Sequence, residues 1–248
     1  GNRIHISYRD ISNQCLKYAT NQSGSWQQTT VDNAGDVGTY TSIALGAAGA
    51  VHISYYDLAN GDLKYASAPG PAGAWTVATV DNDTDVGQFS SIAVDSAQRP
   101  HIAYYDADNF DLKYATDTSG AWASETVDST GNVGQYAAIA LDNADAVYIS
   151  YYDSTNDKLR YVTGELAAWS PPETPDATAG VGRYTSIAID GSKKAHITYY
   201  DAIGGGLKYV TNTPTNFPAS NNWVALPLDS SGDAGLNASI ALSTDMLG

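Results

Sequence analysis

A short phrase recurs five times along the chain, and this repeat constrains the fold more than any other feature of the sequence. The phrase reads HISYRD where it first occurs and returns as HISYYD, HIAYYD, YISYYD and HITYYD at intervals of 47 to 49 residues. A second phrase, SIAL or a close variant, and a single tryptophan keep the same phase in every copy. The chain of 248 residues is therefore predicted to be one domain of five repeats, at about 1–49, 50–98, 99–145, 146–193 and 194–248.

Each repeat contains four segments with the composition of β-strands. In the second repeat they cover residues 52–57, 63–67, 75–81 and 91–95, and Gly, Asn, Asp or Pro separates them. No stretch keeps a period of 3.6 residues, so we expect almost no helix. Four short antiparallel strands in a repeat of this length are typical of a propeller blade. The sequence thus predicts an all-β, five-bladed β-propeller with four antiparallel strands per blade.

The two ends of the chain predict how this propeller closes. The first repeat lacks the SIAL segment that should precede it, and the chain ends with such a segment at Ser239–Leu242. We expect this last strand to complete the first blade, a Velcro closure that removes an open sheet edge. Within a blade, the small residues of SIAL suit the innermost strand. HISYYD is then second, LKYA third and the tryptophan segment outermost.

The hairpin between the second and third strands predicts a repeated ion pair. Asn60-Gly61 is a strong type I′ turn signal, and a two-residue turn there sets Asp57 opposite Lys64. The same offset of seven residues pairs an aspartate with Lys or Arg in every repeat. Opposite charges across a ladder contribute about 0.2–1 kcal/mol. A pair that fixes the register is favoured here over a ring of five charged ligand sites.

The charge and cysteine content of the chain limit its partners. The 12 Lys+Arg stand against 27 Asp+Glu, a formal net charge of -15. So acidic a surface repels a phosphate backbone, which excludes nucleic acid as a partner. No apolar run approaches the roughly 20 residues of a membrane-spanning helix, so we expect no membrane insertion. Cys15 is the only cysteine, which excludes an intramolecular disulfide and a cysteine-based zinc site.

Composition also predicts where the protein works. Few Cys and Lys residues with abundant Asp, Tyr, Thr and Ser are typical of secreted bacterial proteins, so we expect an extracellular or cell-surface location. The sequence begins at Gly1 rather than Met. We therefore expect a monomeric domain of a larger protein.

The loop that enters each predicted innermost strand carries the candidate ligand-binding residues. It begins with Asp and ends with Gly in all five copies, and in four copies a carboxylate or amide lies between them, at Asp36, Asp85, Asn132 and Asp233. An aromatic residue follows the Gly in four copies, at Tyr40, Phe89, Tyr136 and Tyr184. Aromatic faces beside polar groups are used in sugar recognition, and equally in packing between blades. We expect repeated sites between blades or at the upper face, the one that carries these loops. The alternative is that these residues only brace and pack the blades.

One of these loops also resembles the start of a calcium site. Asp81, Asp83 and Asp85 have the spacing of the first calcium ligands, although the bidentate Glu of a complete loop is missing. Calcium is therefore the one cofactor that the residues suggest. The four histidines, His5, His52, His101 and His196, share one repeat position, and Tyr148 replaces the fifth. On a second strand they would lie about 12 Å apart, too far for one metal, so we expect them to bond to the inner hairpin.

Catalysis would require residues that depart from the repeat, because one active site needs different groups from different blades. Nearly every Asp follows the repeat, and the arginines Arg9, Arg99 and Arg183 are among the few departures. The sequence therefore predicts a non-catalytic extracellular module that binds a glycan or a surface partner, and not an enzyme. Two alternatives stay open. One is a glycoside-acting enzyme with an Asp-based site at the channel mouth, and the other is a purely structural or protein-interaction propeller.

The full repeat, W…TVD…DVGQY.SIALD…HISYYD…LKYA, resembles one that recurs in secreted or surface β-propeller proteins of bacteria. Its build is similar to sialidase-type repeats and to five-bladed lectins of the tachylectin type, which implies a propeller fold over the whole chain. The turn at 117–122 resembles a degenerate Asp-box turn, which is structural in that family. The arginines do not match the sialidase triad, and no tachylectin sugar-binding motif is present, so neither activity is carried over.

Overall fold

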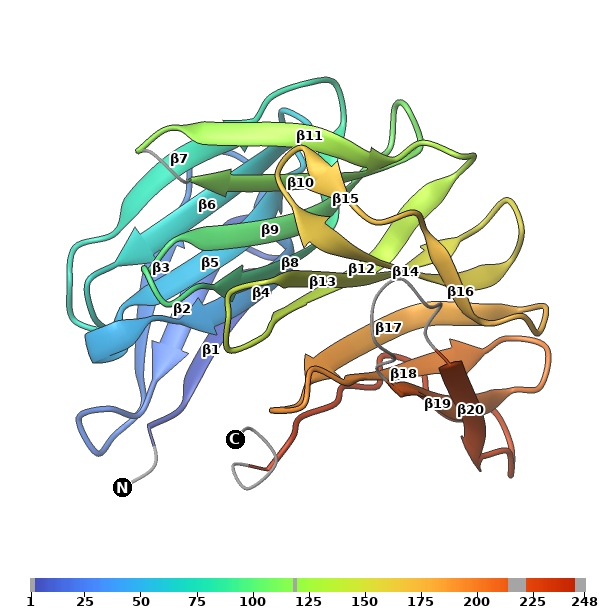
Figure 1. The fold of residues 1–248 in the computed structure, drawn as a ribbon. Helices are drawn as coiled ribbons and strands as arrows, with labels where there is room; N and C mark the ends of the chain where they lie inside the picture. The colour runs from blue at the N-terminus through green and yellow to red at the C-terminus, as the bar shows by residue number, and fades with distance from the viewer. Residues whose placement is uncertain (1–2, 118–119, 214–221, 244–248) are drawn as a thin grey trace. The chain divides into compact units, whose positions relative to one another are not determined.

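The computed structural model describes residues 3–117, 120–213 and 222–243. Its strands form five antiparallel sheets, each of the last four beginning with the SIAL strand at the end of the preceding repeat, and the described residues contain a single turn of 3₁₀ helix, η1 (Ala47–Gly49) (Figure 1). No described helix has the length and apolar character needed to cross a membrane. The contacts between residues divide the chain into two compact units. Unit 1 comprises residues 1–109 and 113–124, and unit 2 comprises 110–112 and 125–248.

The strands follow one another in the order of the sequence. The first sheet contains β1 (His5–Asp10), β2 (Cys15–Thr20) and β3 (Gln27–Asp32). The second contains β4 (Val37–Leu45), β5 (Val51–Asp57), β6 (Asp62–Ala68) and β7 (Thr76–Asp81). The third contains β8 (Val86–Val94), β9 (Pro100–Asp106), β10 (Asp111–Asp117) and β11 (Trp122–Asp128). The fourth contains β12 (Val133–Leu141), β13 (Val147–Asp153), β14 (Lys158–Glu165), β15 (Ala168–Trp169) and β16 (Glu173–Asp176). The fifth contains β17 (Val181–Ile189), β18 (Ala195–Asp201), β19 (Gly206–Thr213) and β20 (Asn222–Asp229).

The order of strands within a sheet confirms the predicted fold class. The second sheet runs β4-β5-β6-β7, with the SIAL strand at one edge, HISYYD beside it, LKYA third and the tryptophan segment last. The SIAL strands of neighbouring sheets pack together, β4 with β8 in unit 1 and β12 with β17 in unit 2. The chain is an all-β protein of the five-bladed β-propeller class.

Two sheets depart from four continuous strands. The outer strand of the fourth sheet is split into β15 and β16 because Pro171 and Pro172, between them, have no N–H for a ladder. The first sheet has three strands, and the predicted closing segment at Ser239–Leu242 has no strand assignment. Its Ile240 N–H donates to Ser186 Oγ at 3.1 Å, so it lies beside β17. Its pairing with β1 stays a prediction.

The register of the second-to-third hairpin differs from the prediction. Asp57 lies opposite Asp62, and Lys64 lies opposite Tyr55, so the pairing is displaced by two residues. The cause is an Asx turn: the Asp57 carboxylate accepts hydrogen bonds from the Asn60 backbone at 3.2 Å and from its side chain at 2.9 Å. This bracing favours a four-residue loop over the predicted two-residue turn. The predicted register is therefore wrong, but the ion pair still forms across it, with Lys64 Nζ 4.0 Å from Asp57 Oδ2 and Lys17 Nζ 3.4 Å from Asp10 Oδ2.

The lysine also belongs to a buried cluster that joins neighbouring sheets. At the end of β7, the Asp81 carboxylate accepts hydrogen bonds from the Tyr104 hydroxyl of β9 at 2.5 Å and from the Lys113 ammonium of β10 at 2.7 Å. We call this arrangement the Asp–Tyr–Lys cluster. It recurs in the second and fifth repeats as Asp32–Tyr55–Lys64 and Asp176–Tyr199–Lys208. The repeated Tyr and Lys therefore connect one sheet to the end of the preceding outer strand.

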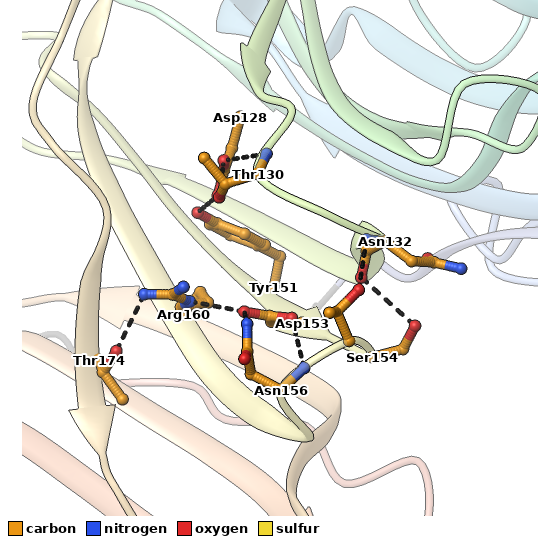
Figure 2. A network of polar contacts seen from close by, with 10 residues as sticks. Asp128, Thr130, Asn132, Tyr151, Asp153, Ser154, Asn156, Arg160 and Thr174 are labelled. Atoms are coloured by element: carbon orange, nitrogen blue, oxygen red, sulfur yellow. Dashed lines mark hydrogen bonds and ion pairs between the residues drawn. The ribbon is translucent and has the colours of Figure 1, made fainter.

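The fourth repeat carries a variant of this cluster, shown in Figure 2. The Tyr151 hydroxyl donates to Asp128 at 2.6 Å, as in the other repeats. Arg160 takes the place of the lysine, and its Nε donates to Asp153 at 2.9 Å within its own sheet. Where arginine replaces lysine, only the tyrosine keeps the bond to the aspartate of the cluster, and all four of these residues lie in unit 2.

Candidate functional site

The four aromatic residues predicted to bind a ligand lie in a bulge of the SIAL strands. All have a left-handed backbone, with φ of 51° at Tyr40, 52° at Phe89 and 54° at both Tyr136 and Tyr184. In the second sheet the register shifts between Thr39 and Ser42, on either side of Tyr40. The preceding Gly87 has a φ of 108°, and a Cβ there would lie 2.7 Å from Leu63 Cα, which explains why glycine ends this loop.

These aromatic residues pack against one another within each unit. The ring centroids of Tyr40 and Phe89 lie 4.6 Å apart, and those of Tyr136 and Tyr184 lie 4.4 Å apart. The Ser90 hydroxyl also donates to the Tyr40 carbonyl at 2.9 Å, which ties the second and third sheets together. Tyr40 is 39% exposed. Packing between blades accounts for these contacts, and a role in ligand binding stays a prediction.

The predicted loop carboxylates also have partners in the neighbouring sheet. Asp36 accepts a hydrogen bond from Arg9 at 2.5 Å, and Asp85 accepts one from the Tyr56 hydroxyl at 2.6 Å. Asp233 accepts one from Tyr200. The fourth loop residue, Asn132, accepts one at 3.3 Å from the side chain of Gln135, and its carbonyl accepts one from Ser154 (Figure 2). A ligand would have to compete with most of these bonds.

A lysine lies between two of the three predicted calcium ligands. The Lys113 ammonium is 2.7 Å from Asp81 and 3.0 Å from Asp83, while Asp85 binds Tyr56 instead. Burial alone would raise the pKa of Asp81, but hydrogen bonds from Lys113 and Tyr104 outweigh it and lower that pKa. Within residues 3–117, 120–213 and 222–243, no three His, Cys, Asp or Glu side chains are grouped to hold a metal. The calcium prediction therefore has no support in the geometry.

The predicted bond from the repeated histidine position to the inner hairpin forms at His196 and at its replacement Tyr148. The His196 ring bonds to Asp190 of the inner hairpin at 3.3 Å, and Tyr148 donates to the equivalent Asp142 at 3.1 Å. On its other side, His196 Nδ1 lies 2.6 Å from the Tyr209 hydroxyl of β19. The corresponding distance is 2.6 Å between His52 and Tyr65. The His196 ring thus joins the inner hairpin to β19, whereas the buried Nε2 of His52 has no hydrogen-bond partner among the described residues.

A pocket of about 600 Å³ lies between the second and third sheets, entirely within unit 1. Trp122 packs edge-on against Tyr65 of the neighbouring sheet, with ring centroids 5.0 Å apart, and both line the pocket. The remaining lining residues come from β6 and β7 and from the inner and outer turns of the third repeat. They are Ser67, Thr76, Ala78, Gln98, Arg99, Pro100, Asp117 and Gly120. The size and the mixture of aromatic and polar walls suit a small ligand.

Arg99 supplies the positive charge in this pocket. Its Nε lies 2.5 Å from Asp95 Oδ2, and its backbone N–H donates to Asp95 Oδ1 at 2.7 Å. The Asp95 side chain is fully buried, whereas that of Arg99 is 40% exposed. Asp95 thus holds the Arg99 guanidinium in place and occupies one of the five N–H groups of that guanidinium. In the described chain no residue accepts a bond from its other nitrogens, so they remain available to a ligand.

One oxygen of the Asp117 carboxylate, Oδ1, is without a donor in the described chain. This oxygen is buried, and no described residue donates a hydrogen bond to it. The pKa of the neighbouring Tyr65 hydroxyl is raised by burial and further by the negative charge of Asp117. A buried acceptor left unpaired is rare in folded proteins and calls for an explanation.

Asp117, and not Arg99, is the charged pocket residue that departs from the repeat. The position of Arg99 is occupied by Arg3, Ala50, Ala146 and Lys194 in the other repeats. The equivalents of Asp117 are Asn21, Ala68, Gly164 and Asn212. The equivalent pocket between the first two sheets, of about 410 Å³, has no charged residue in its lining. The sequence analysis counted Arg99 among the departures, although Arg3 shares its repeat position, and it missed Asp117, which aligning the repeats position by position would have revealed.

Comparison with known proteins extends the description of the fold. No family profile and no curated protein sequence matches the chain. A mutant Aleuria aurantia lectin in complex with Fucα1-6GlcNAc has a TM-score of 0.59 at 12% identity, over 94% of this chain and 81% of that one. An ulvan lyase from a new polysaccharide lyase family has a TM-score of 0.58 at 16% identity, over 90% and 68%. A protein of unknown function from Dyadobacter fermentans has a TM-score of 0.60 at 10% identity, over 90% and 74%. At these identities the likeness shows a shared propeller-like fold.

Proposed function

We propose that the protein is a non-catalytic carbohydrate-binding module, and that the pocket between its second and third sheets holds the sugar. The observation that carries the proposal is the combination of Trp122, Arg99 and the unpaired Asp117 around one pocket. A sugar offers an apolar ring face and a set of hydroxyl groups. An indole can pack on that face, while a guanidinium and a carboxylate bond to the hydroxyls.

The composition of the pocket supports binding rather than glycoside hydrolysis. Most glycosidases use two carboxyl groups flanking the scissile bond, about 5–10 Å apart. Asp117 is the one carboxylate among the ten lining residues. Asp95 does not line the pocket: its side chain is fully buried, paired with Arg99, and 3.4 Å from His101 Nε2. The single carboxylate favours a binding role.

The comparisons support a link to glycans. Two proteins of similar fold act on or bind saccharides, a lectin in complex with Fucα1-6GlcNAc and an ulvan lyase bound to a GlcA-Rha3S saccharide. We extend that chemistry to this chain as part of the proposal. An extracellular or cell-surface location, with a glycan as the partner, is the setting that fits it.

The proposal differs from the sequence-based prediction in the number of binding sites, because the sequence predicted repeated, equivalent sites in the blades. The charged pocket residues Arg99 and Asp117 occur together in the third repeat alone. We therefore assign one specific site per chain. Avidity for a multivalent surface would then require several chains, since repeated weak sites within one chain are not needed.

A glycan array tests the proposed function. The protein should bind a defined set of glycans, and binding should be the same with and without EDTA, because a guanidinium rather than a metal supplies the cationic contact. Binding that disappears in EDTA would contradict the proposed site and restore the calcium interpretation. No binding to any glycan on a broad array would contradict the function itself.

A further inference from the structure

The unpaired Asp117 carboxylate can be traced to a single residue in the facing strand. In the first and fifth repeats, the equivalent side chains Asn21 and Asn212 accept hydrogen bonds at 2.8 Å from the backbone N–H groups of Ile4 and Ala195. In the third repeat Pro100 occupies the position of Ile4 and Ala195. Proline has no N–H, so the donor that the repeat provides elsewhere is missing.

The two charges of the pocket are not equally compensated. Arg99 is neutralised by Asp95, with which it forms a close ion pair. Asp117 has no ion pair with any described residue, so the pocket as a whole carries one uncompensated negative charge. A carboxylate, sulfate or phosphate group on a ligand would be repelled by this charge. A sugar hydroxyl can donate to Asp117, and a neighbouring hydroxyl can accept from Arg99.

A cationic ligand fits the pocket less well than a neutral one. An ammonium group would be attracted to Asp117 but would meet the Arg99 guanidinium, which lines the same pocket. A pair of hydroxyl groups satisfies both side chains without adding charge. Hydroxyl groups also combine with an apolar ring face, for which Trp122 provides the partner.

We propose that Pro100 keeps Asp117 unpaired so that the pocket selects a neutral sugar, with one hydroxyl donating to Asp117 and another accepting from Arg99. This inference rests on the proposed function and defines the class of ligand. Pro100 acts as a positioning residue, because it determines whether Asp117 is free to accept. Uronates and sulfated or sialylated sugars are excluded as ligands of this pocket.

The test combines a glycan array with two variants. The array should contain neutral, uronate, sulfated and sialylated glycans, and the best neutral ligand should then be measured by isothermal titration as its methyl glycoside. Pro100→Ala restores the N–H, which should bond to Asp117 and lower the affinity about 10-fold or more, as expected for losing a hydrogen bond to a charged group. Asp117→Asn should also weaken the neutral ligand, and it should relax the rejection of uronates.

The controls separate this inference from the proposed function and from misfolding. Asn212→Ala alters the equivalent position of the fifth repeat and should leave the affinity unchanged. Circular dichroism and the melting temperature show whether each variant is folded. If the wild type binds only anionic glycans through Trp122, the inference fails and the function stands. The same holds if folded Pro100→Ala and Asp117→Asn both retain wild-type affinity for the neutral glycoside.

Discussion

Replacing Asp81 with alanine should lower the free energy of unfolding by about 3–5 kcal/mol, because it breaks a buried ion pair from one side. The Lys113 ammonium, 2.7 Å from Asp81, would keep its charge in a nearly buried position, and the Tyr104 hydroxyl would lose its acceptor. The remaining acidic partner, Asp83, has a side chain that is 70% exposed and offers little compensation. Urea unfolding followed by tryptophan fluorescence measures the change.

Two controls show whether the effect comes from the buried cluster. Asp83→Ala removes the exposed partner of the same lysine and should cost less than about 1 kcal/mol. Asp81→Ala combined with Lys113→Met removes both charges, and it should recover part of the stability lost in the single variant. A loss below about 1 kcal/mol for Asp81→Ala would show that the Asp–Tyr–Lys cluster does not hold neighbouring sheets together.

Replacing Trp122 with alanine should weaken glycan binding about 100-fold, the size expected for truncating an aromatic residue at the centre of a binding site. The variant removes the indole that packs on Tyr65 and forms a wall of the pocket. Trp122→Phe keeps an aromatic wall and should retain more of the affinity. Titration calorimetry with the glycan found on the array measures both variants.

The matched control is a variant of the sequence-predicted upper face. Asp85→Ala with Phe89→Ala removes one loop carboxylate and one ring of the Tyr40–Phe89 pair, which lies outside the pocket. It should leave the glycan affinity unchanged. Loss of binding in this double variant, with wild-type affinity in Trp122→Ala, would place the site on the upper face and not in the pocket.

The repeat made the fold predictable, because period and phase carry the information that a propeller requires. Strand order followed from the residue types of SIAL and HISYYD, and the bond of His196 to the inner hairpin followed from its repeat position. The register of the hairpin between the second and third strands could not be predicted from the repeat. A two-residue turn at Asn60-Gly61 was the strongest local signal, but the Asp57 carboxylate stabilises a longer loop.

The candidate site was predictable only in part, for a physical reason. Residues that repeat in every blade are those that packing requires. The repeated aromatics and carboxylates, such as Tyr40 and Asp85, therefore have structural partners. The pocket depends on what differs between blades. Pro100 has no N–H to donate to Asp117. This missing hydrogen bond is recognised only by comparison with the fifth repeat, where the Ala195 N–H donates to Asn212.

The most direct test of the pocket is a titration observed through the five tryptophan indole N–H resonances of the ¹⁵N-labelled protein. Trp122→Phe assigns one of these resonances by its disappearance. Addition of the neutral methyl glycoside should shift the Trp122 resonance in a saturable way and leave those of Trp26 and Trp169 in place. Saturable binding that leaves the Trp122 resonance unmoved would contradict the assignment of the sugar to this pocket.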